Sequence, residues 1–145
     1  MKNANLKFFE LSSPKNERDN IKLGLSRIKK AIKELGNPCK NIPAIQIIGT
    51  NGKGSIAAYL ESILFESNKN FGVTTSPHLF DVCERIRVNK KNINKTDFEK
   101  IYTLIEENFA KYELTTFEKI ISCALNFFDN KKVELLILEA GLGGR

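Results

Sequence analysis

Residues 45–55 read "IQIIGTNGKGS" and place a glycine-rich loop directly after a short apolar run. The common phosphate-binding loop has one glycine, then four residues, then Gly-Lys followed by Ser or Thr. Here Gly54 follows Lys53, so Ser55 comes one residue late, and Ile47 stands where the first glycine would be. The stretch therefore predicts either a glycine turn that only caps a helix or a variant of the phosphate-binding loop.

The residues on both sides of this loop predict a strand before it and a helix after it. The segment "PAIQIIG" at 43–49 has the adjacent isoleucines that are typical of a buried strand. Beyond the glycines, apolar residues recur at helical spacing, at Ile56, Tyr59, Leu60, Ile63 and Leu64. Backbone amides at the start of a helix bind phosphate in this setting, so the flanking pattern favours the phosphate-loop interpretation.

The rest of the chain continues the alternation of helices and strands. We expect, in order, a helix at about 20–35 closed by Gly36 and Pro38, a strand at 70–76, an extended segment or hairpin at 84–93, helices opened by capping boxes at Thr96–Glu99 and Thr115–Glu118, and a strand at 133–139. This alternation predicts a three-layer α/β fold with a mostly parallel sheet, of the P-loop ATPase kind.

Two charged residues carry the chemistry that this pattern predicts. Lys53 places a full positive charge in the loop, and its attraction to a phosphate oxygen about 4 Å away is worth ~4 kcal/mol at an effective dielectric of ~20, before desolvation. Glu139 ends the last apolar strand, where a carboxylate can hold Mg²⁺ directly or through water. The alternative for Glu139 is a strand-end acid that only turns toward solvent.

Length and composition are those of one ordinary soluble domain. The chain has 145 residues, of which 41% are hydrophobic and 28% charged. No apolar run reaches the ~18 residues of a membrane span, and the first twenty residues lack the apolar core of a secretory signal. We therefore expect a cytoplasmic protein that does not associate with a membrane.

Cysteine, histidine and charge exclude several other classes of site. The three cysteines are scattered and odd in number, so we expect reduced, packed thiols rather than a disulfide framework. His78 is the only histidine, which argues against a zinc site and against a Ser-His-Asp triad. The net charge of +6 is spread along the chain, which favours anionic small ligands over the concentrated basic stripe of a nucleic-acid binder.

A series of motifs in one order points to a known family. The motifs are "LGNP" at 35–38, "GTNGKGS" at 49–55, "TSPHL" at 75–79, "ERI" at 84–86, "TTFE" at 115–118 and "LEAGLGGR" at 138–145. This series closely resembles the folylpolyglutamate synthase and dihydrofolate synthase family, a branch of the Mur ligases, over nearly the whole chain after about residue 20. By this resemblance the loop is the Mur-ligase form of the phosphate-binding loop.

The resemblance implies a ligase that uses ATP and magnesium to phosphorylate a carboxylate. L-glutamate then attacks the acyl phosphate, and a folate or dihydropteroate is the implied acceptor. The implied ATP-binding residues are Thr50, Asn51, Gly52, Lys53, Gly54 and Ser55. Lys53 would act on the terminal phosphates as the catalytic residue, Ser76 and Glu139 look like magnesium ligands, and Ser55 is a weaker candidate for a metal ligand.

The resemblance also suggests a role for the loop at 77–85, which is similar to a segment near the pterin substrate. An ordinary surface loop that joins two elements would explain the same residues. For His78, in the same loop, we expect a structural role rather than a ligand role.

Full members of this family are much longer than 145 residues and end in a smaller α/β domain that closes over the nucleotide. We therefore expect residues 1–145 to be the amino-terminal portion of the ATP-binding domain, truncated before the carboxy-terminal ligase domain. Such a chain, a monomer belonging to folate and one-carbon metabolism, should bind MgATP weakly and should not ligate, because a domain that is absent cannot close to exclude water.

Three other interpretations stay open on the sequence. The chain could belong to a Mur-type ligase for another carboxylate, although the "SPHL" and "GLGGR" motifs argue against that. It could be a nucleotide-binding module without catalysis, whose ATP binding would not depend on folate or glutamate. It could be a basic nucleic-acid binder, which steeply salt-dependent binding to DNA or RNA would reveal.

Overall fold

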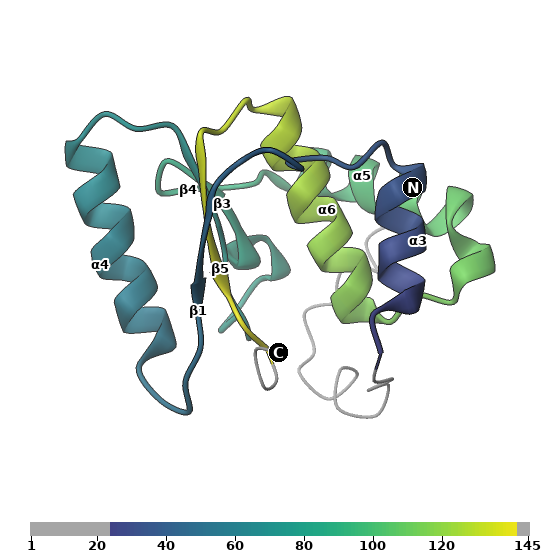
Figure 1. Ribbon diagram of the computed structural model, residues 1–145, viewed down its shortest axis with the longest axis horizontal. Helices are drawn as coiled ribbons and strands as arrows, with labels where there is room; N and C mark the ends of the chain where they lie inside the picture. The colour runs from purple at the N-terminus through teal and green to yellow at the C-terminus, as the bar shows by residue number, and fades with distance from the viewer. Residues whose placement is uncertain (1–23, 142–145) are drawn as a thin grey trace.

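One five-stranded sheet forms the centre of the computed structural model, which describes residues 24–141 (Figure 1). The strands are β1 (Ala44–Ile47), β2 (Phe71–Thr74), β3 (Ile86–Val88), β4 (Lys91–Asn92) and β5 (Leu135–Glu139). Their order is β1-β5-β2-β3-β4. The strands β1, β5 and β2 are parallel, β3 is antiparallel to β2, and β4 is antiparallel to β3. Four of the five strands thus share one direction, which confirms the mostly parallel sheet.

Helices cover both faces of this sheet. They are α3 (Ser26–Glu34), α4 (Lys53–Glu66), α5 (Lys95–Asn108) and α6 (Thr116–Asn130), with short 3₁₀ helices η1 (Val82–Arg85) and η2 (Ala110–Tyr112). Figure 1 shows α4 alone on one face, while α3, α5 and α6 lie on the other. The predicted three-layer α/β architecture is therefore confirmed.

The hydrophobic core is divided between the two sides of the sheet. Adjacent residues of β5 show the division, because Ile137 packs with Ala57 of α4, whereas Leu136 packs with the α5–α6 side. Alternate side chains of a strand point to opposite faces, so one apolar strand supplies both cores. The strand β5 is therefore the common element of both layers.

Two predicted helix starts differ from the structure. The first helix begins at Ser26, later than the expected position near residue 20, and positions 20–23 lie outside the described residues. The predicted capping box at Thr96–Glu99 is wrong. Asn94 caps α5 instead, and its side chain accepts a hydrogen bond from the amide of Asp97. Asn is at least as good a cap as Thr, and it comes two residues earlier.

Two other local predictions are confirmed. The box at Thr115 and Glu118 opens α6, with both reciprocal hydrogen bonds present. The extended segment at 84–93 is a hairpin made by β3 and β4, although its first residues belong to η1.

The strand β1 and the helix α4 are less buried than their sequences predict. Ile45 of β1 is exposed, and the α4 residues Ile56, Tyr59 and Ile63 are exposed to 48%, 72% and 62%. The sheet-facing stripe of α4 consists instead of Ala57, Leu60, Glu61 and Leu64. A helix that is apolar around its circumference usually has neighbours on two sides. Within residues 24–141, β1 pairs only with β5, so this flank of α4 and the outer edge of β1 are both uncovered.

The three cysteines are free and buried, which confirms the expected packed thiols. Burial raises the pKa of the Cys39 thiol to about 11 and that of Cys83 to about 12, and it also raises the pKa of Cys123.

Across residues 24–141, none of the helices has both the length and the apolar character needed to cross a membrane.

A tight contact between β2 and α6 yields a prediction about stability. A Cβ atom added at Gly72 would lie 2.7 Å from a ring carbon of Phe128, whose side chain is fully buried and cannot swing away. We expect Gly72→Ala to lower the free energy of unfolding by about 1–3 kcal/mol through overpacking. Gly54→Ala is the matched control, because nothing lies within 4 Å of its added Cβ and Ala favours a helix. Thermal or urea unfolding measures both, and equal stability of the two variants would contradict the prediction.

Candidate nucleotide and metal site

The glycine-rich loop joins β1 to α4, as predicted for a phosphate-binding loop. Gly52 is the residue before α4 and has a φ of 77°, a left-handed conformation that glycine adopts without a Cβ clash. No side chain caps this helix, so the amides of its first turn are directed toward the space in front of the loop. Four further predicted phosphate-binding residues are exposed there, namely Thr50, Asn51, Gly54 and Ser55.

Lys53 begins α4 and lies against the residue predicted to complete the site. Its Nζ donates a hydrogen bond to the carbonyl oxygen of Gly49 at 3.0 Å and lies 4.0 Å from Oε1 of Glu139. The register of the parallel strands causes this proximity, because Ile47 at the end of β1 pairs with Glu139 at the end of β5. The two charges that the sequence analysis paired are therefore neighbours.

Ser76 joins them from the third parallel strand. It lies two residues beyond β2, and its backbone amide donates a hydrogen bond to Oε2 of Glu139 at 3.2 Å. Each oxygen of Glu139 is thus directed to a different neighbour, Lys53 on one side and Ser76 on the other. The structure brings together the ends of β1, β5 and β2, the edge of an α/β sheet at which ligands usually bind.

The possible metal ligands at this edge of the sheet suit magnesium better than a metal ion whose ligands are all protein side chains. Glu139 offers one carboxylate, and the hydroxyl of Ser76 is close to Gly141, whose missing Cβ leaves that side of the hydroxyl open. Nowhere in residues 24–141 do three or more His, Cys, Asp or Glu side chains form a possible metal cage. Mg²⁺ is typically held by one or two carboxylates together with phosphates and water, so Glu139 and Ser76 suit it.

The loop after Ser76 is held by internal polar contacts. His78 is buried, and its Nδ1 accepts a hydrogen bond from Nε of Arg85 at 2.8 Å, which supports the structural role expected for this histidine. The Glu84 carboxylate accepts hydrogen bonds from three consecutive backbone amides, those of residues 79–81. These contacts fix the loop backbone while Leu79 and Phe80 stay exposed to solvent.

Sequence reasoning missed an ion pair that borders the site. Glu61 of α4 is only 5% exposed, and Nη2 of Arg87 in β3 pairs with it. The available signal was Glu61 itself, because a carboxylate on the sheet-facing stripe of a helix requires a buried partner. Phe117 was also missed, and its ring packs against Gly141 beside Ser76.

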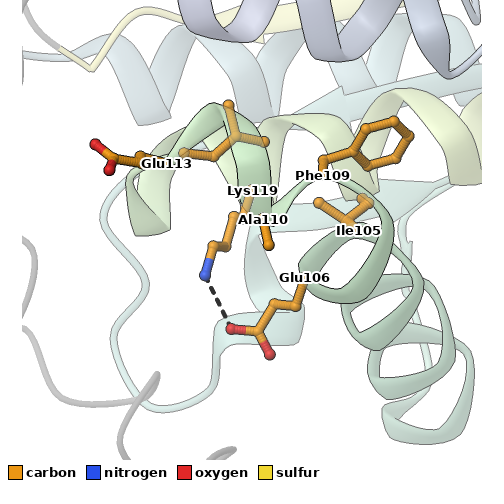
Figure 2. Close-up of a pocket in the computed structure, with 7 residues that line it drawn as sticks. Ile105, Glu106, Phe109, Ala110, Glu113 and Lys119 are labelled. Carbon is orange, nitrogen blue, oxygen red and sulfur yellow. Dashed lines mark hydrogen bonds and ion pairs between the residues drawn. The ribbon is translucent and has the colours of Figure 1, made fainter.

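A separate pocket of about 220 Å³ lies between α5, η2 and α6 (Figure 2). One wall carries an ion pair in which Nζ of Lys119 donates to Oε1 of Glu106 at 2.9 Å. None of the residues predicted for the nucleotide or metal site lines this pocket. It is therefore distinct from the site at the strand ends.

The fold and the site define a class, a three-layer α/β domain in which a strand, a glycine-rich loop and a helix face a strand-end carboxylate. No protein-family model matches the chain. The dihydrofolate synthetase of Saccharomyces cerevisiae is 38% identical over 127 residues, which is 86% of this chain and 30% of that protein. A folylpolyglutamate synthase structure from Thermotoga maritima has a TM-score of 0.83 and 34% identity, covering 96% of this chain and 34% of that one.

A third relative is known with ligands. This bifunctional folylpolyglutamate synthase/dihydrofolate synthase structure contains Mn, AMPPNP and L-glutamate, and it has a TM-score of 0.81 and 34% identity over 86% of this chain and 31% of its own. The chain belongs to the folylpolyglutamate synthase/dihydrofolate synthase family. It spans about a third of the length of these relatives.

The Glu84 contacts yield a prediction about pH. The amide of Leu79 and, after it, those of Asp81 and Phe80 stabilise the charged carboxylate and lower the pKa of Glu84 below its ordinary 4.5. A lowered pKa contributes stability above the ordinary value, which is lost as the pH falls through the lowered value. We expect the amide proton shifts of residues 79–81 to titrate together with Glu84, at a midpoint below 4.5, in an NMR pH series. Glu84→Gln should abolish this joint titration, and a midpoint at or above 4.5 would contradict it.

Proposed function

We propose that this chain carries the ATP-binding part of a ligase that adds L-glutamate to the carboxylate of a folate or dihydropteroate. The observation that carries the proposal is the convergence of Lys53, Ser76 and Glu139 at one edge of the sheet, in front of the start of α4. Family membership supports it, as does the relative that holds L-glutamate beside Mn and AMPPNP. One relative is named a dihydrofolate synthetase and another a folylpolyglutamate synthase, so the comparisons do not decide between dihydropteroate and folate as the acceptor.

The proposed reaction has two steps, both of which need charge neutralisation. A carboxylate oxygen of the acceptor attacks the terminal phosphorus of ATP, and ADP leaves. The amino nitrogen of L-glutamate then attacks the carbonyl carbon of the acyl phosphate, loses a proton, and inorganic phosphate leaves as the amide forms. Phosphoryl transfer of this kind is catalysed mainly by positioning and by fixed positive charge.

The residues of this chain supply those two contributions. The backbone of residues 50–55 would surround the phosphates, with the amides of the first turn of α4 as donors. Lys53 would move from the carbonyl of Gly49 to the terminal phosphates, a short displacement for a flexible side chain. Glu139 and Ser76 would hold magnesium, which when bound neutralises phosphate charge and orients the terminal phosphoryl group.

The extent of the chain limits what residues 1–145 do by themselves. They span about a third of the relatives, and we propose that they form part of the ATP-binding domain, with the closing domain encoded in the relatives' further length. Closure excludes water and aligns the attacking amine. The 145 residues alone should therefore bind MgATP weakly without forming the amide. A chain that binds the nucleotide without forming the amide also matches the alternative interpretation, a nucleotide-binding module without catalysis.

Nucleotide binding provides the first test. We expect AMPPNP with Mg²⁺ to raise the melting temperature of the 145-residue chain, because a ligand that binds only the folded state stabilises it. Lys53→Ala should weaken the binding measured by calorimetry at least ~10-fold, which corresponds to about 1.4 kcal/mol. Lys53 also bonds to the carbonyl of Gly49 and lies beside Glu139, so the melting temperature of the variant without nucleotide is measured first and affinities are compared where both proteins are folded. Equal affinity of the wild-type and Lys53→Ala proteins for the nucleotide would contradict the proposed role of Lys53 in phosphate binding.

A second assay separates ligase from binding module. ADP release is measured with MgATP, L-glutamate and either dihydropteroate or tetrahydrofolate, on the 145-residue chain and on an intact relative. Release by the chain that requires both glutamate and one acceptor would identify the acceptor and contradict the need for further polypeptide. Release by the relative alone is the expected result.

A further inference from the structure

The Arg87 side chain joins three parts of the chain that border the nucleotide and metal site. Arg87 lies in β3, opposite Val73 of β2, and its guanidinium reaches toward α4. Its Nε lies 3.2 Å from both carboxylate oxygens of Glu61, and its Nη2 also donates to Oε1. Its Nη1 donates to Oγ1 of Thr75 at 3.0 Å and to the carbonyl oxygen of Glu84. One group therefore contacts a helix, a strand end and a 3₁₀ helix.

Each contacted residue is tied to a predicted functional residue. Glu61 is on α4, two turns after Lys53, so it moves with the helix whose first turn faces the phosphates. Thr75 directly precedes Ser76, the residue predicted to bind magnesium. Glu84 holds the amides of residues 79–81 and so fixes the far end of the same loop.

The chemistry of this contact is specific to arginine. The guanidinium fork donates in fixed directions, so contacts with Glu61, Thr75 and Glu84 are possible at the same time. A lysine ammonium could still pair with Glu61, but it is a compact charge that cannot reach all three acceptors in this geometry. The Arg87 and Glu61 side chains are 19% and 7% exposed, so water screens the pair only weakly.

We propose that Arg87 is a positioning residue that sets the distance between the phosphate-binding helix α4 and the metal-binding loop at Ser76. It touches neither nucleotide nor metal in this role. Arg87 holds Thr75 and the loop level with the first turn of α4. In this position Ser76 and Glu139 would be able to bind a metal ion that the phosphates also bind. The inference rests on the proposed nucleotide and magnesium site and adds a residue to it.

The test measures how much Mg²⁺ tightens AMPPNP binding to the 145-residue chain, as the ratio of Kd in EDTA to Kd in Mg²⁺. Arg87→Lys keeps the ion pair with Glu61, and so most of its contribution to stability, but loses the bonds to Thr75 and Glu84. We expect the ratio to fall roughly 10-fold, the lower end of the effect of losing a residue that orients a metal ligand. Thr75→Val removes only one acceptor and should reduce the ratio less, in the same direction.

The control is an ion pair with no connection to the loop. Lys119 and Glu106 join α6 to α5 in the other helical layer, beside the pocket of Figure 2. Lys119→Met breaks that pair, so it should alter the melting temperature without changing the Mg²⁺ ratio. A purely structural role for Arg87 predicts instead that Arg87→Lys behaves like this control.

The outcomes separate the inference from the proposed function. Wild-type protein with Mg²⁺-tightened binding, together with an unchanged ratio in Arg87→Lys, would overturn the positioning role and leave the proposed site standing. Wild-type protein that does not bind AMPPNP, or binds it equally well with EDTA, would overturn both. A reduced ratio in Arg87→Lys and Thr75→Val, with Lys119→Met unchanged, is the expected result.

Discussion

The parallel register of β1, β5 and β2 determines the geometry of the whole candidate site. Because Ile47 pairs with Glu139, the residues that follow β1 and the last residue of β5 emerge at the same height. Because Thr74 pairs with Leu138, the loop beyond β2 emerges beside them. A shift of one residue between β1 and β5 would turn Glu139 to the opposite face relative to the loop and separate it from Lys53, and a shift between β2 and β5 would separate Ser76 from Glu139. Both hydrophobic cores hold this register, since Leu136 and Ile137 pack on opposite faces of β5.

Local signals predicted the strands and helices in the right order and paired Lys53 with Glu139, whereas Ser76 was predicted from the family resemblance alone. Glycines after an apolar run located the loop, and an acid at the end of a second apolar run located Glu139, since parallel strands bring their carboxyl ends together. The start of the helix that begins at Lys95 was misplaced by two residues because two good caps, Asn94 and Thr96, compete within three positions. Which of two adjacent caps is used depends on the hairpin that precedes them, and a local pattern does not contain that information.

Long-range contacts could not be derived in the same way. Arg87 and Glu61 are twenty-six residues apart, and only the antiparallel pairing of β3 with β2 directs the guanidinium toward α4. The exposure of Ile56, Tyr59 and Ile63 also escaped prediction, because the apolar pattern of α4 does not show which side has a neighbour. Buried charge and uncovered apolar surface are both properties of the assembled layers.

The flank of α4 and the outer edge of β1, both uncovered within residues 24–141, have a consequence for how the 145-residue chain alone behaves in solution. The residues of β1 carry no charge, and the main-chain groups of alternate residues on its outer side have no strand partner within residues 24–141. Such an edge, bordered by exposed isoleucine and tyrosine side chains, is a template for contact with other chains. Association through apolar surface strengthens in sulfate or phosphate and weakens on cooling. The solubility of the 145-residue chain by itself should therefore fall as sulfate is added and as the temperature rises.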